Sequence, residues 1–481
     1  MNTIMDLNKI NNIFFLGIGG IGMSALARYY HKRGAKVYGY DRTKTPLTEE
    51  LEREGMHIHY DEQIPPLGGG GVFVGEGVFV GEGMFVDEGV DLCIYTPAIP
   101  KTNREFMYFE QSGIPFIKRS QALGMIAKGK ICFAVAGTHG KTSVTTILSH
   151  IFHKYRPITA FIGGISANYD SNFIDYDRAF TVIVEADEYD RSFLSLHPDY
   201  AVITAIDADH LDIYGNKRQL KKTFNEFISQ INPKGFLVTK PKIAQTITAP
   251  CKVKTYSLNN PKTDYHIKKL RIGDKKLQFD LVTPHIIIKN ILFEKIGLHN
   301  VENAVAAAAI CDLEGVDYAT IKQQLESYKG VKRRFEYIIH REDFTYIDDY
   351  AHHPEEIKAC VQAVRSMHPN KKICGIFQPH LFSRTRDFAE GFAQNLLLLD
   401  TVILLDIYPA REQPIEGVDS QMLLDTMDTM DKVNKVEKIL VDKDNLIDCL
   451  KNINPEILVT MGAGDIDRLV NKIKDAFGNE K

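Results

Sequence analysis

Two glycine-rich turns, each lying between a short apolar strand and a helix, constrain the fold of this chain more than any other feature. The first turn covers residues 17–22 and follows an apolar segment, and the second covers 137–143 and also follows one. Such turns are typical of parallel sheets, in which strands and helices alternate along the chain. The sequence therefore predicts an α/β fold with mostly parallel sheets.

The alternation extends over most of the chain. Hydrophobic spacing predicts helices at 22–33, 48–54 and 300–312. Short apolar runs predict strands at 12–17, 36–40, 91–95, 131–136, 180–185, 200–205, 236–239, 346–348, 372–378, 401–406 and 457–462. A β-rich stretch adds strands at 268–272, 276–281 and 285–293. At roughly 150 residues per domain, a length of 481 residues fits three α/β domains of unequal size.

One segment departs from this pattern. Residues 68–89 read GGGGVFVGEGVFVGEGMFVDEG, which repeats a hexapeptide about three times. A short solenoid or a β-meander is one interpretation, but stacked repeats normally need several copies to bury a face. We expect an inserted, glycine-rich surface excursion and assign it no chemistry.

Composition excludes several classes of protein. Hydrophobic residues make up 44% and charged residues 25% of the chain, as in an ordinary globular protein. The net charge of −4 gives no reason to expect nucleic acid or an anionic membrane as a partner. The seven cysteines include no CxxC pair, and neither a leader peptide nor an apolar stretch of membrane-spanning length occurs in the sequence. We expect a cytoplasmic protein with reduced thiols.

The first turn, GIGGIG, has the spacing of a diphosphate-binding loop. Gly17, Gly19, Gly20 and Gly22 allow a tight turn and a close approach of the backbone to a pyrophosphate, and the following helix supplies amide donors. Asp41 lies 19 residues beyond Gly22, where a ribose-binding acid is found in dinucleotide folds. Taken alone, the turn indicates NAD, FAD or another nucleotide diphosphate.

The second turn, GTHGKTS, is a phosphate loop that lacks the first glycine of the full motif, because Val135 stands there. Its backbone amides would cradle phosphates, Lys141 would reach the β and γ oxygens, and Thr142 could bind Mg²⁺. Two acidic clusters, 185–190 and 207–212, follow the expected strands 180–185 and 200–205. Carboxylates at the carboxyl ends of strands near a phosphate loop indicate a nucleotide–metal site.

Further polar groups follow later strands. Asn300 either caps the helix at 300–312 or contacts a ligand. His352 and His353 lie among acids, so a metal site is one interpretation. Arg384 and Arg386 could hold a carboxylate or a phosphate, or could be surface charges.

Taken in chain order, these motifs resemble those of the Mur ligase family. The resemblance rests on GIGGIGMSALA at 17–27, GTHGKTS at 137–143, EADEYD at 185–190, DADHLDIYG at 207–215, GLHNVENAVAAA at 297–308, GVKRRFE at 330–336, DDYAHHPEE at 348–356, FQPHLFSRTRD at 377–387 and MGAGD at 461–465. It implies a Rossmann-like UDP-sugar domain at 1–125 that includes the insertion at 68–89. It also implies a central P-loop ATPase-like α/β domain at 126–330. A C-terminal Rossmann-like domain at 331–481 would bind the amino acid and close on ATP.

The resemblance implies an ATP-dependent ligase that joins L-alanine to the lactoyl carboxylate of UDP-N-acetylmuramate through an acyl phosphate, in peptidoglycan precursor synthesis. Its substrates would be UDP-N-acetylmuramate, L-alanine and ATP, with Mg²⁺ as cofactor; an oligomer is compatible with the sequence. The implied ATP-binding residues are Gly137, Thr138, His139, Gly140, Lys141, Thr142, Ser143, His299, Asn300, Asn303, Arg334 and Asp349. The implied UDP-sugar residues are Gly17, Gly19, Gly20, Gly22, Asp41, Thr96, Ala98 and Asn172.

By the same resemblance, Thr142, Glu185 and His210 would be metal ligands. Tyr350, His352 and Arg384 would form the amino-acid pocket, and the catalytic residues would be Lys141, His352 and Arg384, with His352 as the candidate general base. Leu381 stands where relatives often carry arginine, and Phe224 and Asn225 lie near the position of a carboxylated lysine, so we do not expect that modification.

Three other functions remain open from the sequence. Tyr189 in EADEYD is familiar from a murein tripeptide-recycling ligase, which uses a peptide amine as acceptor. An NAD-dependent oxidoreductase would account for the first turn only. A nucleotide-binding regulator would bind ATP without acceptor-dependent release of phosphate.

Overall fold

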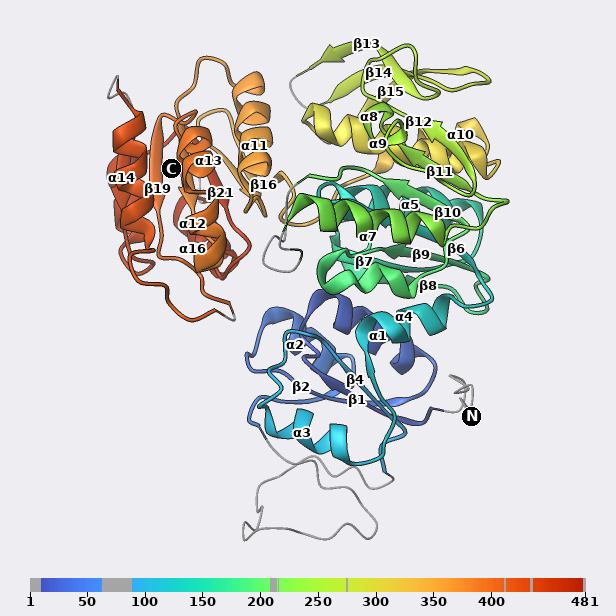
Figure 1. Ribbon diagram of the computed structural model, residues 1–481. Helices are drawn as coiled ribbons and strands as arrows, with labels where there is room; N and C mark the ends of the chain where they lie inside the picture. The colour runs from blue at the N-terminus through green and yellow to red at the C-terminus, as the bar shows by residue number, and fades with distance from the viewer. Residues whose placement is uncertain are drawn as a thin grey trace, which may run out of the picture. The chain divides into compact units, whose positions relative to one another are not determined.

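A computed structural model describes residues 10–62, 89–207, 214, 216–273, 276–410, 412–432 and 436–478 (Figure 1). The chain forms two compact units. The first comprises Met1–Ser257, Pro261–Tyr265 and Ala306–Ile321, and the second comprises Leu258–Asn260, His266–Val305 and Lys322–Lys481. Among the helices in these ranges, none combines the length and the apolarity needed to cross a membrane.

The N-terminal part of the first unit is a five-stranded parallel sheet in the order β3-β2-β1-β4-β5. Its strands are β1 (Asn12–Leu16), β2 (Lys36–Tyr40), β3 (His57–His59), β4 (Leu92–Tyr95) and β5 (Phe116–Lys118). Its helices are α1 (Ile21–Lys32), α2 (Pro46–Arg53), α3 (Arg104–Gln111) and α4 (Arg119–Ala127). All five residues of β1 are buried, as expected for the central strand of a sheet covered on both faces.

The second sheet of the first unit has seven strands in the order β12-β11-β10-β6-β9-β7-β8, parallel except for the β7–β8 pair. Its strands are β6 (Ile131–Ala136), β7 (Ile158–Ser166), β8 (Ser171–Asp175), β9 (Thr181–Glu185), β10 (Tyr200–Ile203), β11 (Phe236–Thr239) and β12 (Lys252–Thr255). The elements between them are α5 (Lys141–Tyr155), the 3₁₀ helix η2 (Tyr189–Ser195), α7 (Lys217–Ser229) and α8 (Pro241–Ala244). The carboxyl ends of β6, β9 and β10 therefore meet at one edge.

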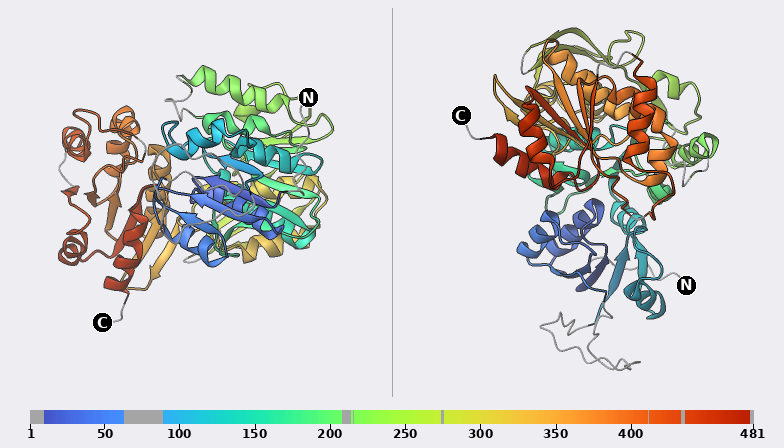
Figure 2. Two further views of the ribbon diagram at one scale, coloured as in Figure 1. Left: turned by 90° about the horizontal axis from the view of Figure 1, so that it is seen from below. Right: turned by 90° about the vertical axis from the view of Figure 1, so that its left-hand side faces the viewer.

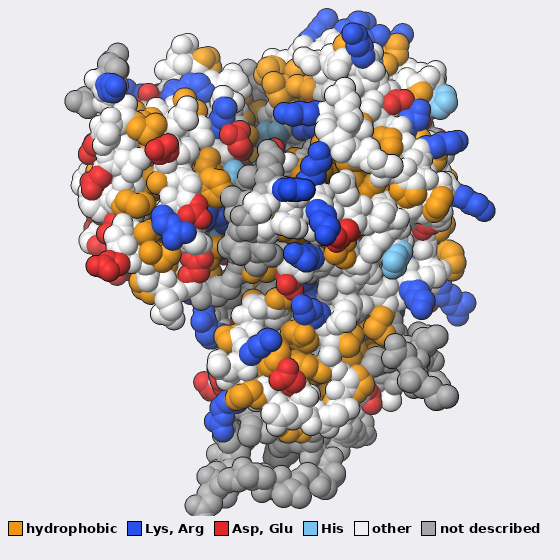
Figure 3. Space-filling model, in the orientation of Figure 1, with side chains coloured by type: hydrophobic (Ala, Val, Ile, Leu, Met, Phe, Trp, Pro, Cys, Tyr) orange, Lys and Arg blue, Asp and Glu red, His pale blue; other side chains and the backbone are white. Residues whose placement is uncertain are grey.

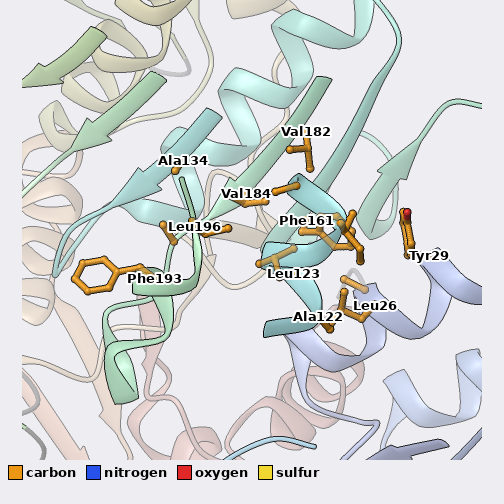
Figure 4. Packing of buried hydrophobic residues seen from close by; sticks show 14 of the residues in the cluster. Leu26, Tyr29, Ala122, Leu123, Ala134, Phe161, Val182, Val184, Phe193 and Leu196 are labelled. Atoms are coloured by element: carbon orange, nitrogen blue, oxygen red, sulfur yellow. The ribbon is translucent and has the colours of Figure 1, made fainter. Parts of the chain in front are cut away.

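One hydrophobic core joins the two sheets of the first unit. Helix α1 supplies Leu26 and Tyr29, which lie close to Phe161 of β7 and Leu123 of α4 (Figure 4). The rings of Tyr29 and Phe161 are 5.7 Å apart between centroids. Helix α1, which begins at the first glycine turn, thus packs on the seven-stranded sheet, which carries the second glycine turn.

The second unit contains an antiparallel sheet, β13 (His266–Ile272), β14 (Leu277–Val282) and β15 (Ile287–Phe293), and a six-stranded sheet in the order β16-β17-β21-β18-β19-β20. The strands of the larger sheet are β16 (Glu336–His340), β17 (Thr345–Asp349), β18 (Ile373–Phe377), β19 (Thr401–Leu404), β20 (Glu437–Leu440) and β21 (Ile457–Met461). All its pairs are parallel except β16–β17.

The six-stranded sheet is covered on both faces, as the alternation along β21 shows. Ile457, Val459 and Met461 belong to a core with α11 (Pro354–Met367), α13 (Ala389–Leu396) and α14 (Ser420–Met430). Leu458 belongs to the opposite core, with α15 (Leu446–Ile453) and α16 (Asp467–Phe477). Figure 2 shows helices on either side of these strands. Helices α9 (Leu298–Leu313) and α10 (Tyr318–Ser327) each have residues in both units, and α12 (Phe382–Asp387) belongs to the second.

The predicted α/β fold with mostly parallel sheets is confirmed. Strands 36–40, 131–136 and 236–239 have the expected bounds, and the other predicted strands differ by a few residues at their ends. Helix α9 begins at Leu298, so Asn300 lies within its first turn and does not cap it. Seven strands among the described residues were not predicted: β3, β5, β7, β8, β12, β16 and β20. In β7, the glycines at 163 and 164 interrupt the strand pattern. The repeat at 68–88 lies outside the described residues.

Candidate functional site

The second glycine turn connects β6 to α5, and two of its glycines have conformations that favour glycine. Gly137 has φ +132°, and a Cβ there would lie 2.2 Å from the Thr204 hydroxyl of the neighbouring strand end. Gly140 has φ +80° and is the N-cap of α5. The turn is tied to the strand beside it, since the Thr138 amide donates to the Ala205 carbonyl at 3.0 Å. His139 and Ser143 are half-buried in the same turn. The backbone amides at the start of α5 thus form a phosphate-binding geometry.

Lys141, the first residue of α5, is held by a buried carboxylate. Its Nζ lies 2.8 Å from both Glu188 oxygens. Burial alone would lower the pKa of Lys141, but the charges of Glu188, Asp187 and Glu185 raise it above its ordinary value. The ammonium is therefore charged and stands where the motif places a phosphate contact.

Thr142 and Glu185 lie side by side at the same sheet edge. The Thr142 hydroxyl donates to Glu185 Oε1 at 3.0 Å, and the Gly163 amide donates to Glu185 Oε2 at 2.9 Å. Burial raises the pKa of Glu185, and the nearby Lys141 charge opposes that shift. The structure thus brings together two of the three predicted metal-binding residues. The third, His210, lies outside the described residues.

The first glycine turn is closed by Asp41 and by the turn after β4. Asp41 Oδ2 accepts the Gly19 amide at 2.9 Å, and burial raises the pKa of Asp41. Gly17 has φ +86°, and a Cβ there would lie 2.5 Å from Thr96 Cγ2. Gly20 and Ala98 are exposed, and Gly22 is half-buried. Among the predicted UDP-sugar residues of the N-terminal sheet, Gly17 is buried and the others are partly or fully exposed.

Asn172, on β8, makes buried contacts with α1. Its Nδ2 donates to the Ile21 carbonyl at 2.5 Å and to the Ser24 hydroxyl at 2.9 Å. Its Oδ1 accepts from Arg28 Nη1 at 2.5 Å. The Asn172 side chain is fully buried, and these bonds occupy both its amide nitrogen and its oxygen. The geometry places it at the start of the helix that follows the glycine turn.

In the second unit, Asp349 ends β17 and is held by backbone amides. Its two oxygens accept the amides of Phe335 at 2.8 Å and Ala351 at 2.7 Å. Burial raises the pKa of Asp349 to about 6, although the Arg334 charge lowers it. Arg334 also lowers the pKa of the buried His299 ring, and burial is the larger cause of that shift to about 4. The Arg334 charge thus acts on both Asp349 and His299.

Two further predicted ATP-binding residues, Asn300 and Asn303, lie on α9. The Asn300 amide donates to the Ile296 carbonyl at 2.6 Å, so this side chain fixes the turn before the helix. Asn303 is half-buried one turn further along α9.

The predicted amino-acid pocket residues also lie together. His352 Nδ1 is 3.0 Å from the Tyr350 carbonyl and 3.3 Å from Glu356 Oε2. Burial lowers the pKa of His352 to about 4, against the opposing charge of Glu356. The His352 and His380 rings are 6.1 Å apart, and Arg384 Nη1 lies 3.4 Å from His380 Nδ1. The residues form one cluster at the carboxyl ends of β17 and β18.

Three residues in these clusters were not singled out from the sequence. Glu188 pairs with Lys141, Glu356 pairs with His352, and Arg119 lies beside the first glycine turn. Glu188 and Glu356 belong to quoted motifs, so their position was a usable signal. Arg119 is part of no motif, and nothing in the local pattern distinguishes it from a surface charge.

Three family models match successive parts of this chain. Residues 12–131 match a model described as Mur ligase family, catalytic domain. Residues 135–311 match the Mur ligase middle domain, and 333–464 match the Mur ligase, glutamate ligase domain.

The chain is 45% identical to UDP-N-acetylmuramate–L-alanine ligase of Christiangramia forsetii, over 99% of each chain. Its fold matches the solved UDP-N-acetylmuramate–alanine ligase of Thermotoga maritima with a TM-score of 0.78 and 27% identity, over 98% of this chain and 100% of that one. A murein peptide ligase of Psychrobacter arcticus has the same fold, with a TM-score of 0.69 and 21% identity, over 98% of this chain and 99% of that one. The chain belongs to the Mur ligase family, which confirms the resemblance stated from its motifs. Two curated relatives, 45% and 44% identical to this chain, act, by their names, on UDP-N-acetylmuramate and L-alanine.

Proposed function

We propose that this chain is an ATP-dependent ligase that forms an amide between the lactoyl carboxylate of UDP-N-acetylmuramate and the amine of L-alanine. The observation that carries the proposal is the identity of 45% over 99% of both chains with a ligase of that name. The proposal includes a cytoplasmic location, where ATP and sugar nucleotides are available.

The reaction consists of two substitutions. A carboxylate oxygen of the lactoyl group attacks the γ-phosphorus of ATP, the bond to the β–γ bridging oxygen breaks, and ADP leaves. The alanine nitrogen then attacks the acyl carbon, the bond to the phosphate oxygen breaks, and inorganic phosphate leaves as the amine loses a proton. Two anions meet in the first step, so neutralising charge is the main demand on the site.

The residues of the first unit suit that demand. Lys141 is charged and is the first residue of α5, whose N-terminal backbone amides favour an anion. The Thr142 hydroxyl and the Glu185 carboxylate, 3.0 Å apart, are oxygen donors of the kind Mg²⁺ prefers, so the donor set fits that ion. They would hold it, with His210 as a further candidate. Bound Mg²⁺ would neutralise charge on the phosphates.

Residues of the second unit supply the other roles in this proposal. Asp349 would accept hydrogen bonds from the ribose, and His299, Asn300, Asn303 and Arg334 would contact the rest of ATP. Arg384 would bind the carboxylate of L-alanine beside Tyr350. His352 is a candidate acceptor for the amine proton, because burial keeps it neutral at pH 7, with a pKa of about 4.

The test is release of phosphate from ATP and UDP-N-acetylmuramate with and without L-alanine. We expect alanine-dependent release with a matching gain in mass of the sugar nucleotide. Release that depends on the murein tripeptide instead would establish the recycling ligase, for which Tyr189 is the one supporting residue. Tight binding of ATP without release for either acceptor would indicate a regulator. Reduction of NAD by the protein would refute the ligase.

A further inference from the structure

Arg119 lies against the first glycine turn, although it comes from a different element. It is the first residue of α4, and a Cβ on Gly22 would lie 2.5 Å from Arg119 Nη1 and 3.2 Å from its Cζ. Gly22 lies inside helix α1 and has no positive φ. The backbone therefore does not require glycine at this position, and glycine is destabilising in a helix relative to alanine. Because Gly22 has no side chain, there is room for the Arg119 guanidinium.

The position of Arg119 is electrostatically unusual. Helix α1 begins at Ile21, and among the described residues no side chain caps its N-terminus and no acid lies in its first turn. Helix N-termini carry partial positive charge and favour anions. A guanidinium beside such an end is the reverse of the usual preference, so two positive features face the same space.

Two carboxylates partly offset this charge. Asp41 Oδ2 accepts the Gly19 amide at 2.9 Å, just before α1 begins. Arg119 Nη2 donates to Asp187 Oδ2 at 3.3 Å, which uses one of the five guanidinium donors. Asp187 lies between Glu185 and Glu188, the residues that contact Thr142 and Lys141. Arg119 therefore lies between the glycine turn and the acidic segment at the phosphate loop, with its side chain 20% exposed.

We propose that Arg119 binds the diphosphate of the sugar nucleotide, together with the amides at the start of α1. This inference rests on the proposed function, which places the diphosphate at the glycine turn. A guanidinium and helix amides converging on one space match the planar, multi-donor recognition that phosphate favours. The absence of a Gly22 side chain permits both sets of donors to reach one ligand.

The experiment measures the dissociation constants of UDP, UDP-N-acetylmuramate and ATP by titration calorimetry for the full chain and its variants. Arg119→Ala should weaken UDP and UDP-N-acetylmuramate by about 10–100-fold, the loss typical of a charged hydrogen bond. It should leave ATP within about twofold, and Arg119→Lys should retain part of the affinity. Lys118→Ala is the matched control, because Lys118 is the adjacent cation and pairs with Asp190 at 3.0 Å. Its constants should stay within about twofold of those of the parent chain.

Three outcomes would overturn the inference. The first is an unchanged constant for UDP in Arg119→Ala. The second is a loss confined to UDP-N-acetylmuramate, which would move Arg119 from the diphosphate to the sugar acid. The third is an equal loss in Asp187→Asn, which would make the ion pair responsible. If Arg119→Ala does not fold, Arg119→Gln and Arg119→Lys replace it. Because binding of UDP requires no turnover, a parent chain that lacks ligase activity would refute the proposed function and leave the Arg119 measurement decisive.

Discussion

Replacing Asn172 with alanine tests whether this residue joins the two sheets of the first unit or contacts the sugar nucleotide directly. Its side chain bonds to Arg28 at 2.5 Å, to the Ile21 carbonyl at 2.5 Å and to the Ser24 hydroxyl at 2.9 Å. Arg28 is itself buried, and Glu54 and Glu50 accept from it at 2.5 and 2.9 Å. Burial alone would lower the pKa of Arg28, but these carboxylates raise it, so the guanidinium stays charged.

The expected loss follows from what the substitution leaves behind. The guanidinium loses one charge-assisted hydrogen bond, worth about 1.5–3 kcal/mol, and a neutral bond is lost at a cost of about 1 kcal/mol. The small cavity adds about 1 kcal/mol. Ser24 still donates to the Ile21 carbonyl at 3.0 Å, so that oxygen keeps a partner. We expect Asn172→Ala to lower the free energy of unfolding by about 3–5 kcal/mol.

The measurement is urea unfolding followed by circular dichroism, with the first cooperative transition compared between variants. Asn232→Ala is the matched control, because Asn232 is exposed and donates to Asp199 at 2.8 Å, where water can replace it. We expect a loss below about 1 kcal/mol for the control. Equal losses in the two variants would refute the reasoning. A stable Asn172→Ala protein whose affinity for UDP-N-acetylmuramate alone is reduced would instead make Asn172 a direct sugar contact.

Three further predictions concern the nucleotide and amino-acid clusters. Lys141→Ala should abolish phosphate release and lower the free energy of unfolding by about 3–5 kcal/mol, because the buried Glu188 carboxylate loses its 2.8 Å ion pair with Lys141. Adding Glu188→Gln should restore stability but not activity. Normal activity in either variant would contradict the role of Lys141. The pKa of Asp349, about 6, lies above its ordinary value, so the carboxylate is ionised above pH 6, and its protonation at lower pH favours the folded state. Because the ribose contact needs the ionised form, the Kd for ATP should rise as the pH falls through 6. This pH dependence should be absent in Asp349→Asn. His352, with a pKa of about 4, should be neutral from pH 6 to 8, so kcat/KM should show no titration near pH 6.5. His352→Gln should lower kcat by about 100-fold or more at every pH in that range.

Single strands and the glycine turns after them could be predicted from the sequence, because the residues that indicate them lie within a few positions of one another. The strand at 131–136 and the turn after it combine an apolar run, glycines and a helix start within a few residues. Several strands were missed. Glycines weaken the pattern of β7, and β3 and β5 have only three residues each. Periodicity reports which residues of one segment are buried, but it does not report which segments meet.

The residue pairs of the site that are far apart in sequence could not be predicted. Lys141 and Glu188 are 47 residues apart, Arg119 and Asp187 are 68 apart, and Arg28 and Asn172 are 144 apart. Asn172 was expected near the sugar on the resemblance. The structure shows its hydrogen bonds to α1, which only the topology of β8 and α1 makes visible. The basic and acidic side chains exposed on the face in Figure 3 show why charge alone does not single out such pairs.

The paired charges also determine how affinity for phosphate should be interpreted. Lys141 is held by Glu188, and Arg119 is held by Asp187, so a phosphate at either place must displace or share a carboxylate. The measured affinity is then the difference between two interactions with the same cation, because a ligand gains only its advantage over the group it replaces. Neutralising the carboxylate while keeping the cation should therefore leave phosphate affinity equal or higher, whereas removing the cation should lower it. The opposite order would mean that the carboxylates orient these cations for the ligand and do not compete with it.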